Sequence, residues 1–120
     1  METIFSQIIR KEIPVDILFE DDIAIAFPDI RPLAPVHVLV IPKKPIESIA
    51  TMEDADAEIV GHLFWVARNV ARDLNISEKG YKLLIRVGQD GGQEIPHLHL
   101  HVLGGARLSE NIHPVVSDKQ

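Results

Sequence analysis

The order of apolar and polar residues predicts one long helix among short strands. Apolar residues recur at threes and fours from Ile59 to Leu74, which is the spacing of a single helix face. We therefore expect an amphipathic helix of about five turns that ends near Asn75. Thr51 and Asp54 resemble a capping box at its start. A short N-terminal helix of about two turns is predicted over residues 4–10.

Five runs along the chain have the character of short strands. They are β-prone or continuously apolar, and acidic, proline or glycine residues bound them. They cover residues 16–20, 23–27, 36–41, 81–87 and 97–103. Strands, one long helix and then two more strands predict an α+β fold, in which a mostly antiparallel five-stranded sheet carries the helix on one face.

Composition narrows the class of protein. The 120 residues suit a single domain spanning residues 1–120, whose polar tail, 106–120, we expect to be loose or to depend on a partner. The absence of cysteine excludes disulfides and thiolate chemistry and suits the cytoplasm. A net charge of −6 argues against a nucleic-acid polymer as partner. No apolar run is long enough for a membrane span, and the N-terminus does not read as a signal peptide.

Three histidines alternate with apolar residues in the last predicted strand. His97, His99 and His101 would share one face of the sheet, because successive side chains of a strand point to opposite faces. The apolar residues between them would face the core. Neighbouring rings would then lie roughly 6.5–7 Å apart and the outer two about 13 Å apart.

The residues alone leave three interpretations of this row. The histidines can be a chance feature of a solvated sheet face. An i, i+2 pair with His37 can hold a zinc ion, although about 13 Å between the outer rings prevents all three from binding one ion. The middle ring can also act as a neutral nucleophile while a flanking ring donates a hydrogen bond or a proton.

The glycine-rich stretch GQDGGQE, residues 88–94, precedes the histidine row and has two compatible interpretations. Asp90-Gly91 is a good turn pair for joining two strands. Glycines also let backbone N–H groups approach an anion closely. A loop that cradles phosphate beside a nucleophilic imidazole would suit attack at phosphorus.

Several motifs together resemble a known family. The stretch HLHLHVL resembles the signature of the histidine triad (HIT) superfamily. The order and spacing of IFSQIIRKEIP, FEDD, AFPDI, APVHVLVIPKK, DGGQE and HLHLHVLGG are similar to its Hint branch, the histidine triad nucleotide-binding proteins. The resemblance runs from about residue 4 to residue 105. It implies a HIT-like fold and a homodimer whose sheets join into one ten-stranded sheet.

The resemblance also implies a chemistry and the residues that perform it. Hint proteins hydrolyse phosphoramidates of nucleoside monophosphates, typically of purines, with no metal or cofactor. The resemblance makes His99 the nucleophile, with His101 bound to the phosphoryl oxygen and His97 and His37 orienting groups and relaying protons. Asp29 would hold the ribose. The remaining implied contacts are Ile4, Phe5, Ile8, Phe27 and Ile30 for the base, and Gly92, Gln93 and Glu94 for the phosphate.

Most of these residues also have plain structural interpretations. The apolar positions would be core residues in most folds, Asp29 can stabilise a turn beside Pro28, and His37 can be a buried structural histidine. The chain also departs from the family pattern at Arg86, where an asparagine is usual. An arginine there can bind the phosphate or the leaving group, or can block the ribose contact.

The sequence therefore favours one function over two others. The main hypothesis is a hydrolase that cleaves nucleoside 5′-phosphoramidates or aminoacyl-adenylates through a nucleotidyl-histidine intermediate. The alternatives are a nucleotide-binding regulatory module with little turnover and a zinc-binding protein.

Overall fold

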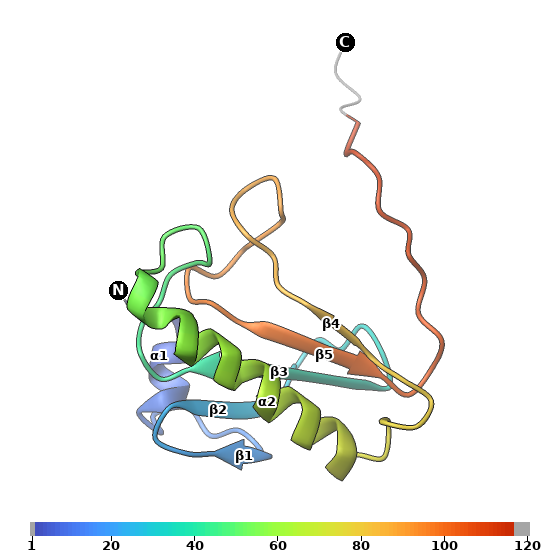
Figure 1. Cartoon of the computed structure of the whole chain (residues 1–120), viewed down its shortest axis with the longest axis horizontal. Helices are drawn as coiled ribbons and strands as arrows, with labels where there is room; N and C mark the ends of the chain where they lie inside the picture. The colour runs from blue at the N-terminus through green and yellow to red at the C-terminus, as the bar shows by residue number, and fades with distance from the viewer. Residues whose placement is uncertain (1, 117–120) are drawn as a thin grey trace.

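One antiparallel sheet organises the molecule. The computed structural model describes residues 2–116 of the chain. Within this part, five strands pair in the order β1-β2-β3-β5-β4, and every neighbouring pair is antiparallel. The expected α+β fold with a five-stranded sheet is thereby confirmed (Figure 1). The strands are β1 (Phe19–Glu20), β2 (Ala24–Pro28), β3 (Val36–Pro42), β4 (Lys82–Leu84) and β5 (Leu100–Gly104).

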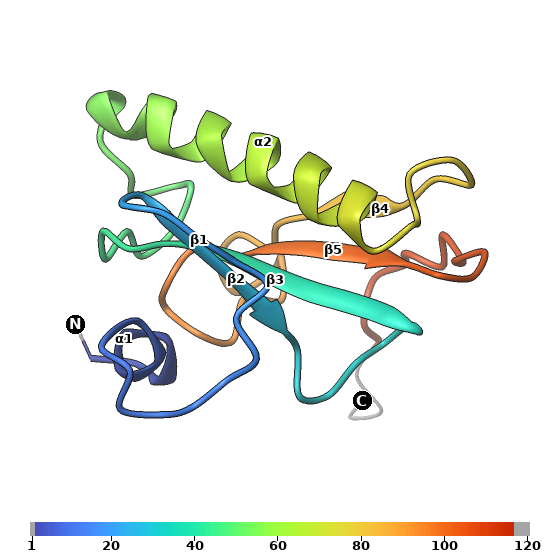
Figure 2. The same cartoon turned by 90° about the horizontal axis from the view of Figure 1, so that it is seen from below.

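Helices cover both faces of the sheet, whereas the sequence pattern predicted a helix on one face only. The long helix α2 (Ala57–Asp73) packs its apolar stripe on the first face. The short helix α1 (Ile4–Ile9) lies on the opposite side, as Figure 2 shows. Phe5 and Ile8 of α1 are buried against a second apolar cluster on that side. The sheet therefore separates two cores.

Strand alternation decides which residues enter each core. In β3, Val38 and Val40 belong to the α2 core, whereas Leu39 and Ile41 belong to the α1 core. His37 has the same parity as Leu39, and Leu39 lies opposite His101 in the β3–β5 register. The two histidines therefore point to the α1 side of the sheet, which is the side that carries the candidate chemistry.

The long helix begins later than the sequence suggested. A 3₁₀ turn, η1 (Asp54–Asp56), precedes α2. The backbone N–H of Glu53 donates to the carboxylate of Asp56 at 3.1 Å, and the Thr51 hydroxyl donates instead to the carbonyl of Ser48 at 3.4 Å. The predicted capping pair of Thr51 and Asp54 is therefore wrong, because both residues lie in turns that precede the helix.

The last strand is also shorter than predicted. It begins at Leu100, not at residue 97. The backbone N–H of Leu98 donates to the carbonyl of Ile46 at 2.8 Å, so this segment is bonded to the loop after β3 and not to the strand ladder. His97 and His99 therefore lie in an extended segment that leads into β5.

The C-terminal end of the described region carries no regular structure. Residues 105–116 contain no helix or strand, and the Lys82 ammonium donates to the carbonyl of Ser109 at 2.7 Å. The last four residues of the predicted tail lie outside the described residues. Among residues 2–116, no helix has both the length and the apolar character that a membrane crossing requires.

Candidate active site

A cavity of about 600 Å³ opens on the α1 side of the sheet. It gathers most of the residues that the resemblance implied. Its apolar wall includes Ile4, Phe5, Ile8, Phe27 and Ile30. Its polar wall includes Asp29, His37, Arg86, Glu94, His99 and His101, with Gly92 beside them. A larger groove of about 820 Å³ lies near the loop after α2, but no histidine lines it, so we take the smaller cavity as the candidate site.

Sequence reasoning missed six further lining residues. They are Val15, Pro28, Arg31, Leu33, Leu39 and Ile95. Strand alternation could have found Leu39, since it shares the parity of His37 in β3. The others lie in connecting segments or at a strand end, where no periodic signal assigns a side chain to a face.

Two predicted site residues lie outside the cavity wall. His97 is buried, and its Nε2–H donates to the carbonyl of Pro42 at 2.9 Å. The Gln93 amide donates to the carbonyls of Glu47 and Ile95 at 2.8 and 3.0 Å. Both side chains therefore brace the loops that flank the cavity and do not face into it.

The glycine loop closes on itself. The N–H of Gly92 donates to the carbonyl of Gln89, and the N–H of Gln93 donates to the carbonyl of Gly88, each at 3.0 Å. Gly88 and Gly92 have φ angles of +69° and +82°, which a residue with a side chain rarely adopts. The turn interpretation fits this loop. The N–H groups of Gly92 and Gln93 are therefore not available to bind a phosphate as the sequence suggested, because both donate within the turn.

His99 has a fixed tautomer. Its Nδ1 lies 2.7 Å from the carbonyl oxygen of His97, and a carbonyl only accepts, so Nδ1 carries the proton. Neutral His99 therefore keeps a lone pair on Nε2, which has no hydrogen-bond partner among residues 2–116. The ring lines the cavity and meets the ring of Phe5 edge-on, with centroids 5.1 Å apart. His99 thus lines the cavity and carries a nitrogen lone pair that is not used in a hydrogen bond.

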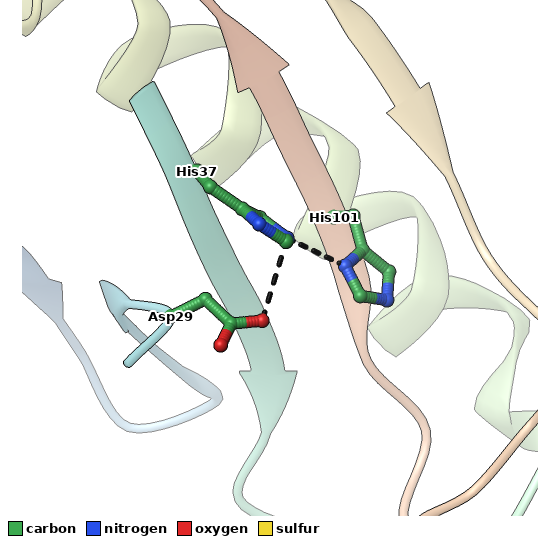
Figure 3. A group of neighbouring side chains, drawn as sticks. All are labelled: Asp29, His37 and His101. Carbon is green, nitrogen blue, oxygen red and sulfur yellow. Dashed lines mark hydrogen bonds and ion pairs between the residues drawn. The ribbon is translucent and has the colours of Figure 1, made fainter. Parts of the chain in front are cut away.

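A second group of side chains, centred on Asp29, His37 and His101, forms a chain of contacts (Figure 3). The backbone N–H of Leu33 donates to Nδ1 of His37 at 3.0 Å. Nε2 of His37 lies 2.9 Å from Nδ1 of His101 and 3.5 Å from Oδ2 of Asp29. At the far end, Nε2 of His101 lies 3.1 Å from Nη1 of Arg86. These contacts link the loop before β3 to Arg86, which follows strand β4 and lines the cavity.

The same three residues are also the best candidate for a metal. The ligand atoms of Asp29, His37 and His101 lie within 4.8 Å of one another. A histidine bound to a metal normally donates its remaining N–H to an acceptor. Here the remaining nitrogen of His37 accepts from Leu33, and that of His101 faces the Arg86 cation. The donors around the two rings therefore do not fit a metal site.

Comparison with known proteins identifies the family. The HIT domain matches residues 10–108. The chain belongs to the HIT domain family. An uncharacterised HIT-like protein of Synechocystis sp. is 49% identical over 108 residues, which cover 90% of this chain and 94% of the relative.

Solved structures of HIT proteins agree with this assignment. The HIT family hydrolase from Legionella pneumophila is 42% identical with a TM-score of 0.88, over 92% of this chain and 98% of that one. The histidine triad nucleotide-binding protein from Candida albicans is 28% identical with a TM-score of 0.76, over 93% and 87%. The resemblance to the histidine triad superfamily is confirmed.

Burial holds four histidines of this HIT domain, His37, His97, His99 and His101, in their neutral form. Removal from water lowers the pKa of His37, His97 and His99, because the imidazolium loses hydration. The same burial lowers the pKa of His101 to about 3, because a proton there would also be repelled by the Arg86 cation and by any proton added to His99 or His37. All four rings are therefore neutral at neutral pH.

This burial predicts a pH-dependent stability. Below the ordinary histidine pKa of 6.5, the unfolded chain binds protons that the folded HIT domain does not. The stabilisation is complete above pH 6.5 and is lost as the pH falls. The unfolding free energy at pH 5.5 should be lower than at pH 7.0 by about 1 kcal/mol for each ring that stays fully neutral in the folded state. Urea unfolding at pH 8.0, 7.0 and 5.5 tests this, and a stability at pH 5.5 equal to that at pH 7.0 would contradict it.

Proposed function

We propose that this HIT domain is a nucleotide-binding hydrolase that cleaves nucleoside 5′-phosphoramidates or aminoacyl-adenylates. One observation carries the proposal. The His97 carbonyl holds Nδ1–H of His99 and leaves a neutral Nε2 lone pair on a residue that lines a ligand-sized cavity. A HIT family hydrolase and a histidine triad nucleotide-binding protein are among the structures that this chain matches, which supports the reaction class and the ligand.

The apolar wall suits a purine base. The rings of Phe5 and Phe27 meet edge-on with centroids 5.9 Å apart, and both are buried. Ile30 is exposed at the cavity and could cover the base from the solvent side. Asp29 offers a carboxylate for the ribose hydroxyls, with Oδ1 already accepting from the backbone N–H of Arg31 at 2.9 Å. The base and ribose would then orient the phosphate toward the histidines.

The reaction proceeds in two displacements at phosphorus. Nε2 of His99 attacks, a new P–N bond forms to the ring, and the bond from phosphorus to the leaving group breaks. In a phosphoramidate this is the P–N bond, and the amine takes a proton from solvent and leaves. In an aminoacyl-adenylate it is the P–O bond, and the carboxylate leaves as an anion. Water then attacks the nucleotidyl-histidine, releases the nucleoside monophosphate and a proton, and returns His99 to its neutral form. The sum consumes one water for each bond cleaved.

The surrounding groups would assist this chemistry in different ways. As the His99 ring becomes cationic, its Nδ1–H bond to the His97 carbonyl gains charge and strengthens. His101 would donate from Nε2 to a phosphoryl oxygen, while His37 holds its other nitrogen at 2.9 Å. His97 would thus contribute through its carbonyl, and its ring would anchor the segment to Pro42.

We also propose that the protein is a cytoplasmic homodimer. The strands β1 and β4 each pair with one neighbour within the described sheet, so each leaves an edge for a second sheet. The lack of cysteine suits a reducing compartment.

Replacing the nucleophile should remove turnover. For a fluorogenic adenosine phosphoramidate, we expect His99→Ala and His99→Gly to lower kcat by at least about 10³-fold. Free imidazole should restore part of the activity of His99→Gly, because it can occupy the vacated space. His113→Ala, in the exposed tail, is the control and should stay within twofold of wild type. Turnover within tenfold of wild type in His99→Ala would defeat the assignment, and AMP binding without turnover in any form would favour the regulatory alternative.

The pH profile should show a nucleophile that stays neutral in mild acid. Because burial lowers the pKa of His99, its lone pair survives below pH 6.5 and is lost only as the pH falls through the lowered value. The acid limb of kcat/KM should therefore have its midpoint below pH 6.5. A midpoint above pH 6.5 in the wild type would argue against neutral His99 as the attacking group.

The oligomeric state has a direct measurement. Light scattering on a size-exclusion column should give twice the monomer mass at micromolar concentrations. A monomer mass across the whole concentration range would exclude the joined sheet.

A further inference from the structure

Arg86 and His101 face each other in an unusual way. Nη1 of Arg86 lies 3.1 Å from Nε2 of His101, which is hydrogen-bond distance. A guanidinium has donors and no acceptor, so this contact is a hydrogen bond only if Nε2 of His101 carries no proton. Whether it does is decided by the rest of the contact chain.

The proton positions follow from one backbone group. The N–H of Leu33 donates to Nδ1 of His37, so the proton of His37 is on Nε2. That nitrogen lies 2.9 Å from Nδ1 of His101, which must therefore accept. The proton of His101 is then on Nε2 and points toward Arg86. An imidazolium form of His101 would keep that proton, so protonation does not relieve the contact.

The opposite arrangement would be less favourable. With its proton on Nδ1, His101 would accept from Arg86 but would turn an N–H against the N–H of His37 at 2.9 Å. Both rings are buried and held by strands β3 and β5, so that clash could not relax. The Asp29 carboxylate, 3.5 Å from Nε2 of His37, also favours a proton on that nitrogen by its negative charge. The two facing N–H donors are therefore those of Arg86 and His101, at the cavity wall, and not those of His37 and His101.

Arg86 also lacks a compensating charge. Among residues 2–116 it makes no ion pair, and its one polar contact is with His101. Its side chain passes over the glycine loop, where a Cβ added to Gly92 would meet Cδ at 3.5 Å and Nε at 3.9 Å. The amides of Gly92 and Gln93 beneath it are already bonded within the turn. A permanent cation and an adjacent N–H donor thus share one cavity wall without an acceptor.

We propose that Arg86 and His101 form a two-donor clamp for one anionic oxygen of the nucleotide phosphate. Arg86 takes the part that the sequence assigned to the amides of the glycine loop. An anionic oxygen between the two donors would accept from both and neutralise the guanidinium charge. The identity of the ligand rests on the proposed function. The clamp defines the substrate class as nucleotides with a free anionic oxygen on the attacked phosphorus, in preference to uncharged phosphoramidate diesters.

Paired ligands measure the clamp without turnover. Calorimetry compares AMP with adenosine on wild type, Arg86→Gln and Arg68→Gln. Arg68 is exposed on α2, across the sheet from the cavity, so Arg68→Gln is a control that removes the same charge elsewhere. Arg86→Gln should weaken AMP binding at least tenfold and leave adenosine within twofold, whereas Arg68→Gln should change neither beyond twofold. Arg86→Lys keeps the charge without the planar fork and should retain more AMP affinity than Arg86→Gln.

The tautomer of His101 gives an independent result. Nitrogen-15 NMR should find His101 protonated on Nε2 in the free protein and in the AMP complex. Protonation on Nδ1, or an AMP affinity that Arg86→Gln leaves within twofold of wild type, would overturn the clamp.

The two proposals fail differently. Selective loss of AMP binding in Arg86→Gln, in a protein that turns over no phosphoramidate, would keep the clamp and reject the hydrolase. Phosphoramidate turnover in the wild type, together with AMP binding that Arg86→Gln does not change, would keep the hydrolase and reject the clamp. A wild-type protein that does not bind AMP would reject both.

Discussion

Fixed backbone groups determine where each buried imidazole carries its proton. The carbonyls of Pro42 and His97 hold the protons of His97 and His99, and the N–H of Leu33 occupies a lone pair of His37. A neutral imidazole has one donor and one acceptor, so each contact also decides what the other nitrogen can do. The proposed chemistry depends on this constraint, because a ring that exchanged tautomers would offer its lone pair to the cavity only part of the time.

The fold supplies this constraint by covering both faces of the sheet. Helix α2 buries one face in an ordinary apolar core, and helix α1 covers the histidine face. The ring of Phe5 meets His97 and His99 edge-on, with centroids 5.8 and 5.1 Å apart. This cover removes the rings from water and keeps them neutral. Burial therefore preserves the lone pair of His99 at neutral pH, and the hydrogen bond to His97 directs it.

Part of this site was readable from the sequence. Alternation from His97 to Val102 correctly separated the histidines from the apolar residues that enter the α2 core. The same pattern left a solvated strand face open as one interpretation, whereas all three histidines are buried. The predicted ring spacing of roughly 6.5–7 Å is too wide, because the ring centroids of His99 and His101 lie 5.0 Å apart. The covering helix is remote in sequence, and no local period reports it. Hydrogen bonds to main-chain carbonyls are equally invisible in the sequence. The ring of His97 was therefore expected in the site, whereas it bonds to Pro42 and only the His97 carbonyl contacts His99.

The tautomer of His99 tests this account most directly. Nitrogen-15 NMR of the free protein at pH 7, with the ring resonances assigned by comparison with His99→Gln, distinguishes the two neutral forms from the imidazolium. The account predicts a proton on Nδ1 and a bare Nε2. A proton on Nε2, in either the other neutral form or the imidazolium, would contradict it, since no lone pair would then be available to attack phosphorus.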